Sequence, residues 1–581
     1  MTHKTSLSAR YVRWMNHLHA RMGRRARAAT GFTSQPEPRT IGSFARGRQL
    51  GAGNFQFAGF LVEDKDAGLW DIEMPTDMFK QEVHGFQWLD DLASVGDGPA
   101  RKAAQDWVFE WINRFGSGHG AGWTPDLTGR RLIRWINHAL FLLQGREAAD
   151  SEAYFQSLAH QTIFLSKRWK VASAGLPRFE ALTGLIYAGL ALNGMDEHVK
   201  PAVKALAREC REQIDAEGGI STRNPEELLE VFSLLIWAAS ALSEAGWIAQ
   251  HDHLSAIERI APTLRAMRHS DGGLARFHGG GRGIEGRLDH ALATSGVRAE
   301  STAGLQMGYA RLKAGRTSVI VDASQPPQGK SSTHGHASTL AFELTSGRRP
   351  LIVNCGSGIS FGEDWQRAGR ATASHSVLGI QGHSSSRLGS GAALLHTPKI
   401  VDIKQSSDKG GSSLEASHDG YEKSHGLIHS RRIDQSFDGR MMSGDDILTA
   451  YTQTDKRRFD LAMDATQLKG LAYSVRFHLH PDVDAALDMG GQAVSLALRS
   501  GEIWVFRHGG GVELSLESSV YLEKNRLKPR ATKQIVLSGR ALGYASRVSW
   551  SLNKAQDTPE GLRDLTRDDD ILPTTPNGET E

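Results

Sequence analysis

The sequence predicts a multidomain protein in which an all-α domain is followed by an all-β domain. Its 581 residues exceed the length that one hydrophobic core usually serves. From about residue 84 to 270, apolar residues recur with the period of an α-helix, without strand signals between them. After about residue 305, short apolar runs alternate with turn residues, which is typical of a β-sandwich.

The first 44 residues are a basic N-terminal extension. Residues 1–40 contain eight Lys or Arg and a single acidic residue, Glu37, and they lack the apolar core and cleavage site of a secretory signal. One interpretation is an amphipathic helix at a membrane surface, with Tyr11, Trp14, Met15 and Leu18 on one side. The other, which we favour at this stage, is a frayed or loosely docked extension.

Residues 45–304 are assigned to the helical domain. Ala103, Trp107, Trp111 and Phe115 recur four positions apart, and a glycine-rich turn ends that pattern. Further helices are expected at residues 132–143, 153–169, 179–193, 199–215, 225–246 and 254–267. Turns rich in Gly, Pro or Asn separate these segments, so the sequence predicts an array of helical hairpins.

Residues 305–555 are assigned to the β-domain. Strands are expected at residues 317–322, 338–344, 350–354, 493–498, 503–507, 512–516 and 548–552. The last segment, 556–581, is polar and acidic with scattered prolines, and we expect it to be disordered.

Composition excludes several functional classes. The net charge of +3 gives no general attraction to nucleic acid, and no run of about twenty apolar residues predicts a transmembrane helix. The two cysteines, Cys210 and Cys355, form neither a disulfide framework nor a metal motif.

Several motifs resemble the heparinase II/III-like family. They lie at residues 54–59 (NFQFAG), 84–89 (HGFQWL), 333–344 (THGHASTLAFEL), 351–356 (LIVNCG), 371–375 (ATASH) and 475–482 (VRFHLHPD). The resemblance implies an (α/α) toroid packed on an antiparallel β-sandwich, with a sugar-binding cleft between them. It also suggests a periplasmic or envelope location, although the chain shows no export signal that we recognise.

Enzymes of this family are lyases that cleave uronate-containing, anionic polysaccharides by β-elimination. Such a site neutralises the uronate carboxylate, removes the adjacent proton with a base and protonates the leaving oxygen with an acid. The resemblance therefore implies a lyase for an anionic polysaccharide. The alternative is a non-catalytic glycan-binding or envelope-associated protein on the same fold, and the sequence names neither a substrate nor an oligomeric state.

Three residues are candidates for catalysis. His334 matches the family histidine that neutralises charge or transfers a proton. Arg178 is the one cation in the segment 175–180, where active members carry an Asn-His pair, but it also reads as an arginine that starts a helix or pairs with Glu180. Glu227 stands nearest the position of the family tyrosine, which is absent, and burial would have to raise its pKa for it to act as a base. Its other interpretation is a first-turn acid of a helix capped by Asn224.

Two residues are candidates for substrate binding. Arg223 follows a glycine-rich turn and is expected to line a cleft for an anionic sugar. Trp123 lies in a glycine-rich loop and can stack on a sugar ring, although core packing is the alternative for the tryptophans of this domain. Tyr187 and Tyr309 are possible replacements for the missing family tyrosine, but the sequence does not place them in the cleft.

The metal prediction rests on the resemblance alone. His336, Asn354 and His375 match the positions that hold a divalent metal, usually zinc, in some members. Metal-binding relatives carry Asp where this chain has Asn354, and a neutral amide is a poor zinc ligand beside two neutral imidazoles. Ser338 also replaces an Asp that is often found near the second histidine. The alternative for His334 and His336 is a pair of polar loop histidines bonded to backbone carbonyls, and we favour it over a metal site.

Overall fold

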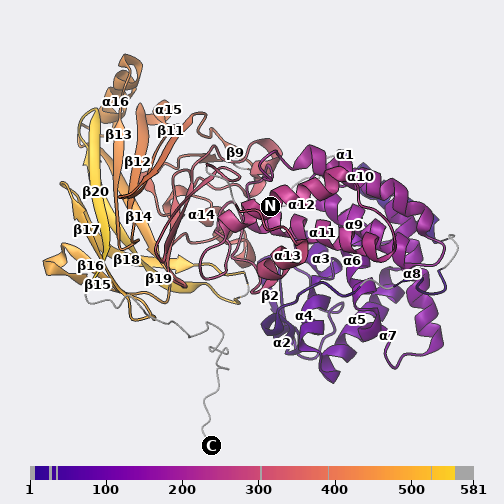
Figure 1. The fold of residues 1–581 in the computed structure, drawn as a ribbon. Helices are drawn as coiled ribbons and strands as arrows, with labels where there is room; N and C mark the ends of the chain where they lie inside the picture. The colour runs from indigo at the N-terminus through magenta and orange to yellow at the C-terminus, as the bar shows by residue number, and fades with distance from the viewer. Residues whose placement is uncertain are drawn as a thin grey trace, which may run out of the picture.

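A computed structural model describes residues 7–24, 29–34, 37–300, 304–389, 391–524 and 526–555. The helical domain and the β-domain lie side by side, and the chain crosses from one to the other once its helices are complete (Figure 1). The predicted fold class is confirmed. The acidic segment 556–581 lies outside the described residues, so its expected disorder stays a prediction.

The helical domain contains thirteen α-helices among the described residues. They are α1 Leu7–Gly23, α2 Phe44–Gly51, α3 Asp77–His84, α4 Gln87–Val95, α5 Gly98–Phe115, α6 Pro125–Asn137, α7 Ala139–Leu143, α8 Ala148–Arg168, α9 Leu176–Ala191, α10 Val199–Gln213, α11 Pro225–Glu244, α12 His251–Met267 and α13 Arg287–Ser295. A hairpin of β1 (Asn54–Phe57) and β2 (Phe60–Glu63) lies between α2 and α3. Each predicted helix is present, except that the segment 132–143 is divided at His138 between α6 and α7.

Helices α6 and α9 approach each other through two glycines. A Cβ atom added at Gly129 would lie 2.3 Å from the Glu180 carbonyl oxygen, and one added at Gly184 would lie 2.4 Å from the Gly129 Cα. This close contact brings Arg130 to the Glu180 carboxylate, where its Nε and Nη2 atoms each donate at 2.8 Å. The start of α9 is therefore fixed against α6.

The β-domain consists of two large antiparallel sheets. The first has the order β10-β11-β12-β13-β20-β17-β16-β15, and the second has the order β18-β19-β14-β6-β5-β4-β3 with β7 added to β14. Their strands are β3 Tyr309–Ala314, β4 Thr317–Asp322, β5 Phe342–Ser346, β6 Arg349–Val353, β7 Leu378–Ile380, β10 Val401–Asp408, β11 Gly411–Tyr421, β12 Leu427–Ser436, β13 Met441–Thr449, β14 Leu471–Leu479, β15 Asp484–Asp488, β16 Ala493–Ala497, β17 Ile503–Gly509, β18 Glu513–Tyr521, β19 Arg530–Ala541 and β20 Ala545–Lys554.

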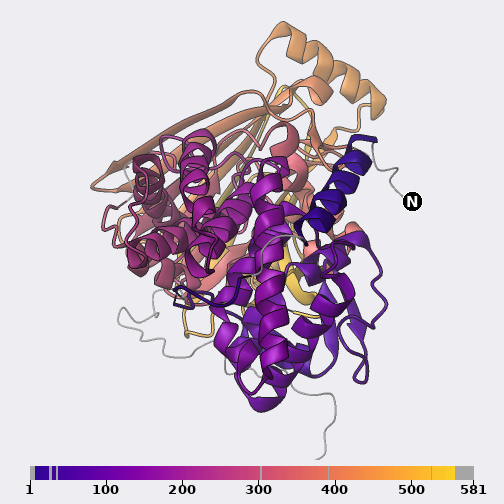
Figure 2. The ribbon, with the colours of Figure 1, turned by 90° about the vertical axis from the view of Figure 1, so that its right-hand side faces the viewer.

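Smaller elements connect these strands. They are the two-residue strands β8 (Arg387–Leu388) and β9 (Leu394–Leu395) and the helices α14 (Glu363–Gly369), α15 (Glu422–His425) and α16 (Gln453–Ala465). Figure 2 shows α16 standing clear of the sheets at the end of the β-domain. Of the expected strands, the segment 338–344 is wrong in its first half, because β5 begins only at Phe342.

The N-terminal extension is docked on the helical domain, which corrects the expectation of a loose segment for the residues described. The Nε atom of Arg168 on α8 donates to the Asn16 side chain of α1 at 2.8 Å, and the ring of His160 contacts the Ala20 carbonyl oxygen. Asn16, Ala20 and Gly23 are buried against this neighbour. Helix α1 is therefore an integral part of the fold.

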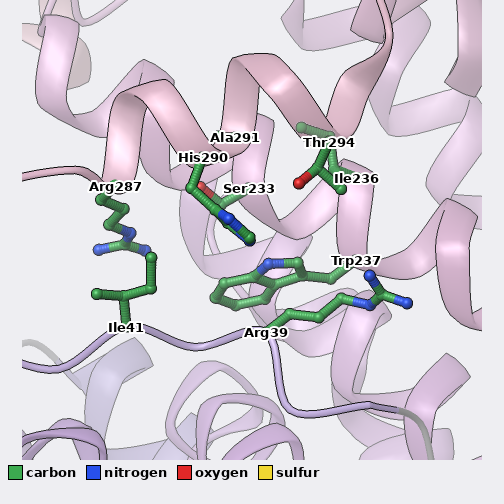
Figure 3. Close-up of a pocket in the computed structure, with 9 residues that line it drawn as sticks. All are labelled: Arg39, Ile41, Ser233, Ile236, Trp237, Arg287, His290, Ala291 and Thr294. Carbon is green, nitrogen blue, oxygen red and sulfur yellow. The ribbon is translucent and has the colours of Figure 1, made fainter. Parts of the chain in front are cut away.

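The segment that follows α1 crosses helices α11 and α13. Arg39 bonds to Glu244 at the end of α11. Figure 3 shows the Trp237 indole between the side chains of Arg39 and His290, in a small pocket that this segment closes. Among the described residues, no helix is both long and apolar enough to span a membrane.

Candidate functional site

The candidate site lies where the first turn of α11 meets the β-domain. Lys524, in the loop between β18 and β19, bonds through its ammonium group to Glu226 of α11. Glu226 also accepts the backbone N–H of Gly281 at 2.8 Å. Burial opposes the charge on Glu226, but Lys524 and this N–H outweigh it and hold the pKa of the carboxyl below its usual value. The lysine therefore links the two domains at this edge.

Glu227 stands beside this ion pair. The Asn224 side chain accepts the backbone N–H groups of Glu226 and Glu227, so it caps α11 as the sequence indicated. Burial raises the pKa of Glu227 to about 6, and the carboxylate of Glu180 acts in the same direction while Lys524 opposes it. The Glu227 carboxyl group therefore changes its protonation state close to neutral pH.

His334 faces the same edge from the β-domain. It ends a short 3-10 turn, Gly329–His334, and its Cβ lies 2.9 Å from the position of a Cβ added at Gly279 of the helical domain. The Gln366 side-chain amide lies 3.3 Å from its Nδ1 atom. Burial lowers the pKa of His334, and the cations Arg370 and Lys524 lower it further, so the imidazole is neutral at pH 7.

Arg178 is engaged within the helical domain. Its Nη1 atom donates to Glu209 of α10 at 3.0 Å, and its Nη2 atom donates to the Ala172 carbonyl oxygen at 2.9 Å. Glu209 also accepts the N–H of Gly175, so the pair fixes the start of α9 to α10. The partner is Glu209, whereas the sequence suggested Glu180. Both of these Arg178 donors are already used within the helical domain. The catalytic role of Arg178 stays a prediction.

Arg223 does not line a cleft, which corrects the prediction made from its glycine-rich turn. The side chain is 8% exposed. Its Nε atom donates to the Met307 carbonyl oxygen at 3.0 Å, and Nη2 donates to Asp322 of β4 at 2.7 Å. Nη1 donates to the Gln325 carbonyl oxygen at 2.7 Å. Because each nitrogen of the guanidinium is used, the residue joins the domains and does not present itself to a sugar.

Trp123 is likewise corrected. Its side chain is 1% exposed and packs against Trp111, His160 and Phe164, while its Nε1 atom donates to the Phe115 carbonyl oxygen at 3.0 Å. The glycines around it shape a tight turn and do not expose the ring. It belongs to the core of the helical domain.

None of the nine tyrosines of the sequence is an exposed phenol beside Glu227, and all nine fall among the described residues. Six are buried: Tyr154, Tyr187, Tyr309, Tyr421, Tyr473 and Tyr521. The Tyr309 hydroxyl donates to the Arg223 carbonyl oxygen, and Tyr187 on α9 is fully buried. The other three, Tyr11, Tyr451 and Tyr544, lie on α1 or beside α16. Neither proposed substitute for the family tyrosine reaches the site.

His336 and His375 bond to each other. Their Nδ1 and Nε2 atoms lie 3.0 Å apart. Gly279 donates its N–H to His336 Nε2 at 3.0 Å, so the ring proton of the neutral imidazole belongs on Nδ1, facing His375. The Nδ1 atom of His375 donates in turn to the Ala371 carbonyl oxygen at 2.8 Å. Burial lowers the pKa of His375 to about 4 and that of His336 well below its usual value, so both rings are neutral.

Asn354 completes the predicted metal set but fits a metal poorly. Its Oδ1 atom accepts the N–H of Ser376 at 3.0 Å, and its Nδ2 atom faces Glu343 at 3.3 Å. No three potential ligands of the His, Cys, Asp and Glu types cluster for a metal within the described part of the chain. The donor set is two neutral imidazoles and an occupied amide, which lacks the negative charge that favours zinc.

A second buried network escaped sequence reasoning. His278 accepts the backbone N–H of His336 through Nδ1 at 3.0 Å, and its Nε2 atom lies 3.4 Å from Asp322. Ser338, which replaces a family Asp, donates to the same carboxylate at 2.6 Å. Burial disfavours the charge on Asp322, yet Arg223 and His278 keep the pKa of this carboxyl far below its usual value. No motif in the sequence predicts this contact between the domains.

Lys524 also gave little signal in the sequence, because it lies in an ordinary charged loop between strands. Its importance arises from the fold, which carries that loop across to α11. The assembled site therefore contains Glu226, Glu227 and Glu180 from the helical domain, and Lys524 and His334 from the β-domain. Lys524 is paired with Glu226, and Arg130 is paired with Glu180. Three carboxylates therefore meet at this edge, and two of them are paired with cations.

Comparison with known proteins agrees with this architecture. The family model described as "Heparinase II/III-like, C-terminal" matches residues 296–551, which span the β-domain. These residues form a heparinase II/III-like C-terminal domain. The chain is similar to solved structures over nearly its whole length, including a crystal structure of heparinase III with a TM-score of 0.66 and 14% sequence identity. That alignment covers 95% of this chain and 91% of the other.

Two further relatives deserve mention. Heparan sulfate lyase HepC from Pedobacter heparinus, solved as a mutant, gives a TM-score of 0.55 at 14% identity and covers 94% of this chain and 89% of that one. "FtsZ-localized protein C" of Caulobacter vibrioides is 29% identical over 545 residues, or 90% of this chain and 91% of that protein. The similarity to the heparinase structures establishes the toroid and sandwich fold of this chain.

Proposed function

We propose that this heparinase II/III-like protein is a non-catalytic member of the fold that acts with the FtsZ division machinery at the cell envelope. One observation carries the proposal: Lys524 of the β-domain is paired with Glu226 of the helical domain at the edge where the two domains meet. An anionic polysaccharide, which the sequence suggested as partner, would find this lysine already occupied.

The chemistry of β-elimination argues in the same direction. The reaction needs donors that neutralise the uronate carboxylate, and Arg223, which the sequence placed in a cleft for an anionic sugar, is consumed by Asp322 and backbone carbonyls. It also needs a proton donor for the leaving oxygen, and no exposed tyrosine stands beside Glu227. A free Arg223 and an exposed tyrosine beside Glu227 are thus both lacking among the described residues.

The similarity to FtsZ-localized protein C supports the positive part of the proposal, because it extends over nearly all of both chains. A sedimentation experiment tests it. The purified full-length protein is mixed with FtsZ in the presence or absence of GTP, with heparinase III as a control of the same fold. We expect it to pellet several-fold more with assembled filaments, while heparinase III stays in solution. Equal pelleting of the two proteins would reject the association.

The non-catalytic part is tested separately. Incubation with heparan sulfate, alginate and bacterial exopolysaccharides should give no unsaturated product absorbing in the near ultraviolet. Product formation by the folded protein that disappears in Glu227→Gln would reject this part of the proposal, whatever the outcome with FtsZ.

A second candidate function, a lyase with an altered set of catalytic groups, is favoured by one specific observation. Glu227 has a pKa raised to about 6 by burial, and both Glu227 and the neutral His334 lie close enough to Lys524 for its charge to shift their pKa values. In that reaction Glu227 would be the base and His334 would bond to the uronate carboxylate. Such an enzyme would gain activity as pH rises through about 6 and lose it in both Glu227→Gln and His334→Ala.

A further inference from the structure

Helix α1 carries a continuous apolar stripe that faces solvent. Its members are Leu7, Tyr11, Trp14, Leu18 and Met22, spaced by three or four positions as on one face of a helix. They are 84%, 62%, 59%, 38% and 61% exposed. A folded domain rarely leaves five large apolar side chains in one exposed row, so this row indicates a surface that is covered in use.

No other part of the chain that the structure describes covers this stripe. The opposite face of α1 holds Asn16, Ala20 and Gly23, which are buried against α8. Because the helix is fixed through that face, the stripe points away from the domain. Figure 2 shows α1 lying along the outside of the helical domain near the N-terminus.

Positive charge surrounds the stripe. Helix α1 contains no acidic residue, and Arg13 and Arg21 are exposed beside the stripe, as is Arg24 just after the helix. The exposed residues Lys167 and Lys170 add positive charge where α8 ends near α1. Burial lowers the pKa of His19 on α1, and the nearby cations Arg168 and Lys167 lower it further. The patch therefore combines an apolar row with basic flanks.

We propose that the exposed face of α1 binds the surface of an anionic lipid bilayer, with the helix lying in the plane of the headgroups. Tyr11 and Trp14, whose ring centroids lie 6.2 Å apart, suit the boundary between headgroups and acyl chains. The arginines match anionic headgroups. A second copy of the chain is a poorer occupant, because pairing α1 with α1 would bring like charges together. The inference goes beyond the function proposed above and depends on neither FtsZ nor a polysaccharide.

Vesicle flotation tests the proposal. The full-length protein is mixed with vesicles of phosphatidylglycerol and phosphatidylethanolamine, or of phosphatidylcholine alone, and the floating fraction is measured. We expect flotation with the anionic vesicles, at least tenfold less with phosphatidylcholine, and a decrease as salt is raised. The paired variant Trp14→Ser/Leu18→Ser should lose at least tenfold of its vesicle binding.

A matched control separates the stripe from exposed apolar residues in general. Leu461 on α16 and Leu468 just after it are 70% and 67% exposed. Leu461→Ser/Leu468→Ser should float like the parent protein. A charge variant, Arg21→Glu/Arg24→Glu, keeps the stripe and should also lose binding, and it provides an independent test if the serine variant fails to fold.

Four outcomes would overturn the proposal. The first three are no flotation of the parent protein, equal flotation on both kinds of vesicle, and unchanged flotation of folded stripe and charge variants. A fourth is a dimer in light scattering that the stripe variant dissolves, which would assign the face to self-association. Because the vesicles contain no FtsZ, these results are distinguishable from failure of the FtsZ experiment.

Discussion

The Nη2 atom of Arg223 lies 2.7 Å from the Oδ1 atom of Asp322, so an arginine of the helical domain neutralises a carboxylate of the β-domain. Asp322 is fully buried, and its charge cannot be relieved by water. Arg223→Met should therefore lower the free energy of unfolding by about 3–5 kcal/mol, the usual cost of breaking a buried pair. Urea denaturation checks this value. The control Arg211→Met breaks the exposed pair with Asp252 and should cost less than about 1 kcal/mol.

Glu227 should make stability depend on pH. Its pKa is raised to about 6 in the folded state, so the folded protein binds the proton more tightly than the unfolded chain and loses stability as pH rises from about 4.5 to 6. Glu227→Gln removes this loss. We expect the variant to be more stable than the parent by about 2 kcal/mol at pH 7.5, and the difference to become small at pH 4.5. A variant that is less stable at pH 7.5 would show that the charged carboxylate is favourable.

The bonded pair of His336 and His375 predicts that zinc is not required for folding. Metal analysis of the purified protein should give far less than one zinc per chain, and a chelator should leave the melting temperature unchanged. Zinc binding at this site would need His336 to turn its Nδ1 proton away from His375. One zinc per chain, lost in His375→Ala, would contradict the interpretation.

The contact between Gly129 and Gly184 predicts a strong response to a single methyl group. A Cβ at Gly129 would lie 2.3 Å from a backbone oxygen of α9, which cannot move without shifting that helix. Gly129→Ala should destabilise the protein by about 1–3 kcal/mol or more. Gly51→Ala, at a helical glycine whose added Cβ meets nothing within 4 Å, serves as the control and should be neutral or slightly stabilising. Thermal unfolding distinguishes the two.

Periodicity predicted the architecture well because the hydrophobic pattern determines whether a segment forms a helix or a strand. It located the helices from α5 to α12 and several strands of the β-domain. It missed the strands between residues 401 and 479, and α16. Strand β10 shows the reason: most of its residues are exposed at the edge of a sheet, so its sequence carries little apolar alternation.

The site was predicted less well, because the role of a polar residue depends on what the fold places opposite it. Glu227 and His334 do lie at the edge where the domains meet. Arg223 and Trp123 do not line a cleft as expected. Arg223 pairs with Asp322, and Trp123 packs in the core of the helical domain. The sequence around each of these two residues is compatible with either a cleft or an interior position. For Arg223, the choice between a cleft and an interior position depends on Asp322, which lies more than ninety positions away in the sequence.

The network around Asp322 also limits how the protein can be divided into fragments. A fragment beginning after residue 304 would lack Arg223 and His278, and it would expose a carboxylate that is fully enclosed in the intact chain. Glu343 would lose its contacts with His269 and Arg276 in the same cut. We therefore expect the segment that matches the family model to be unstable when it is produced alone. Functions of the two halves are better separated by point substitutions in the full-length protein than by truncation.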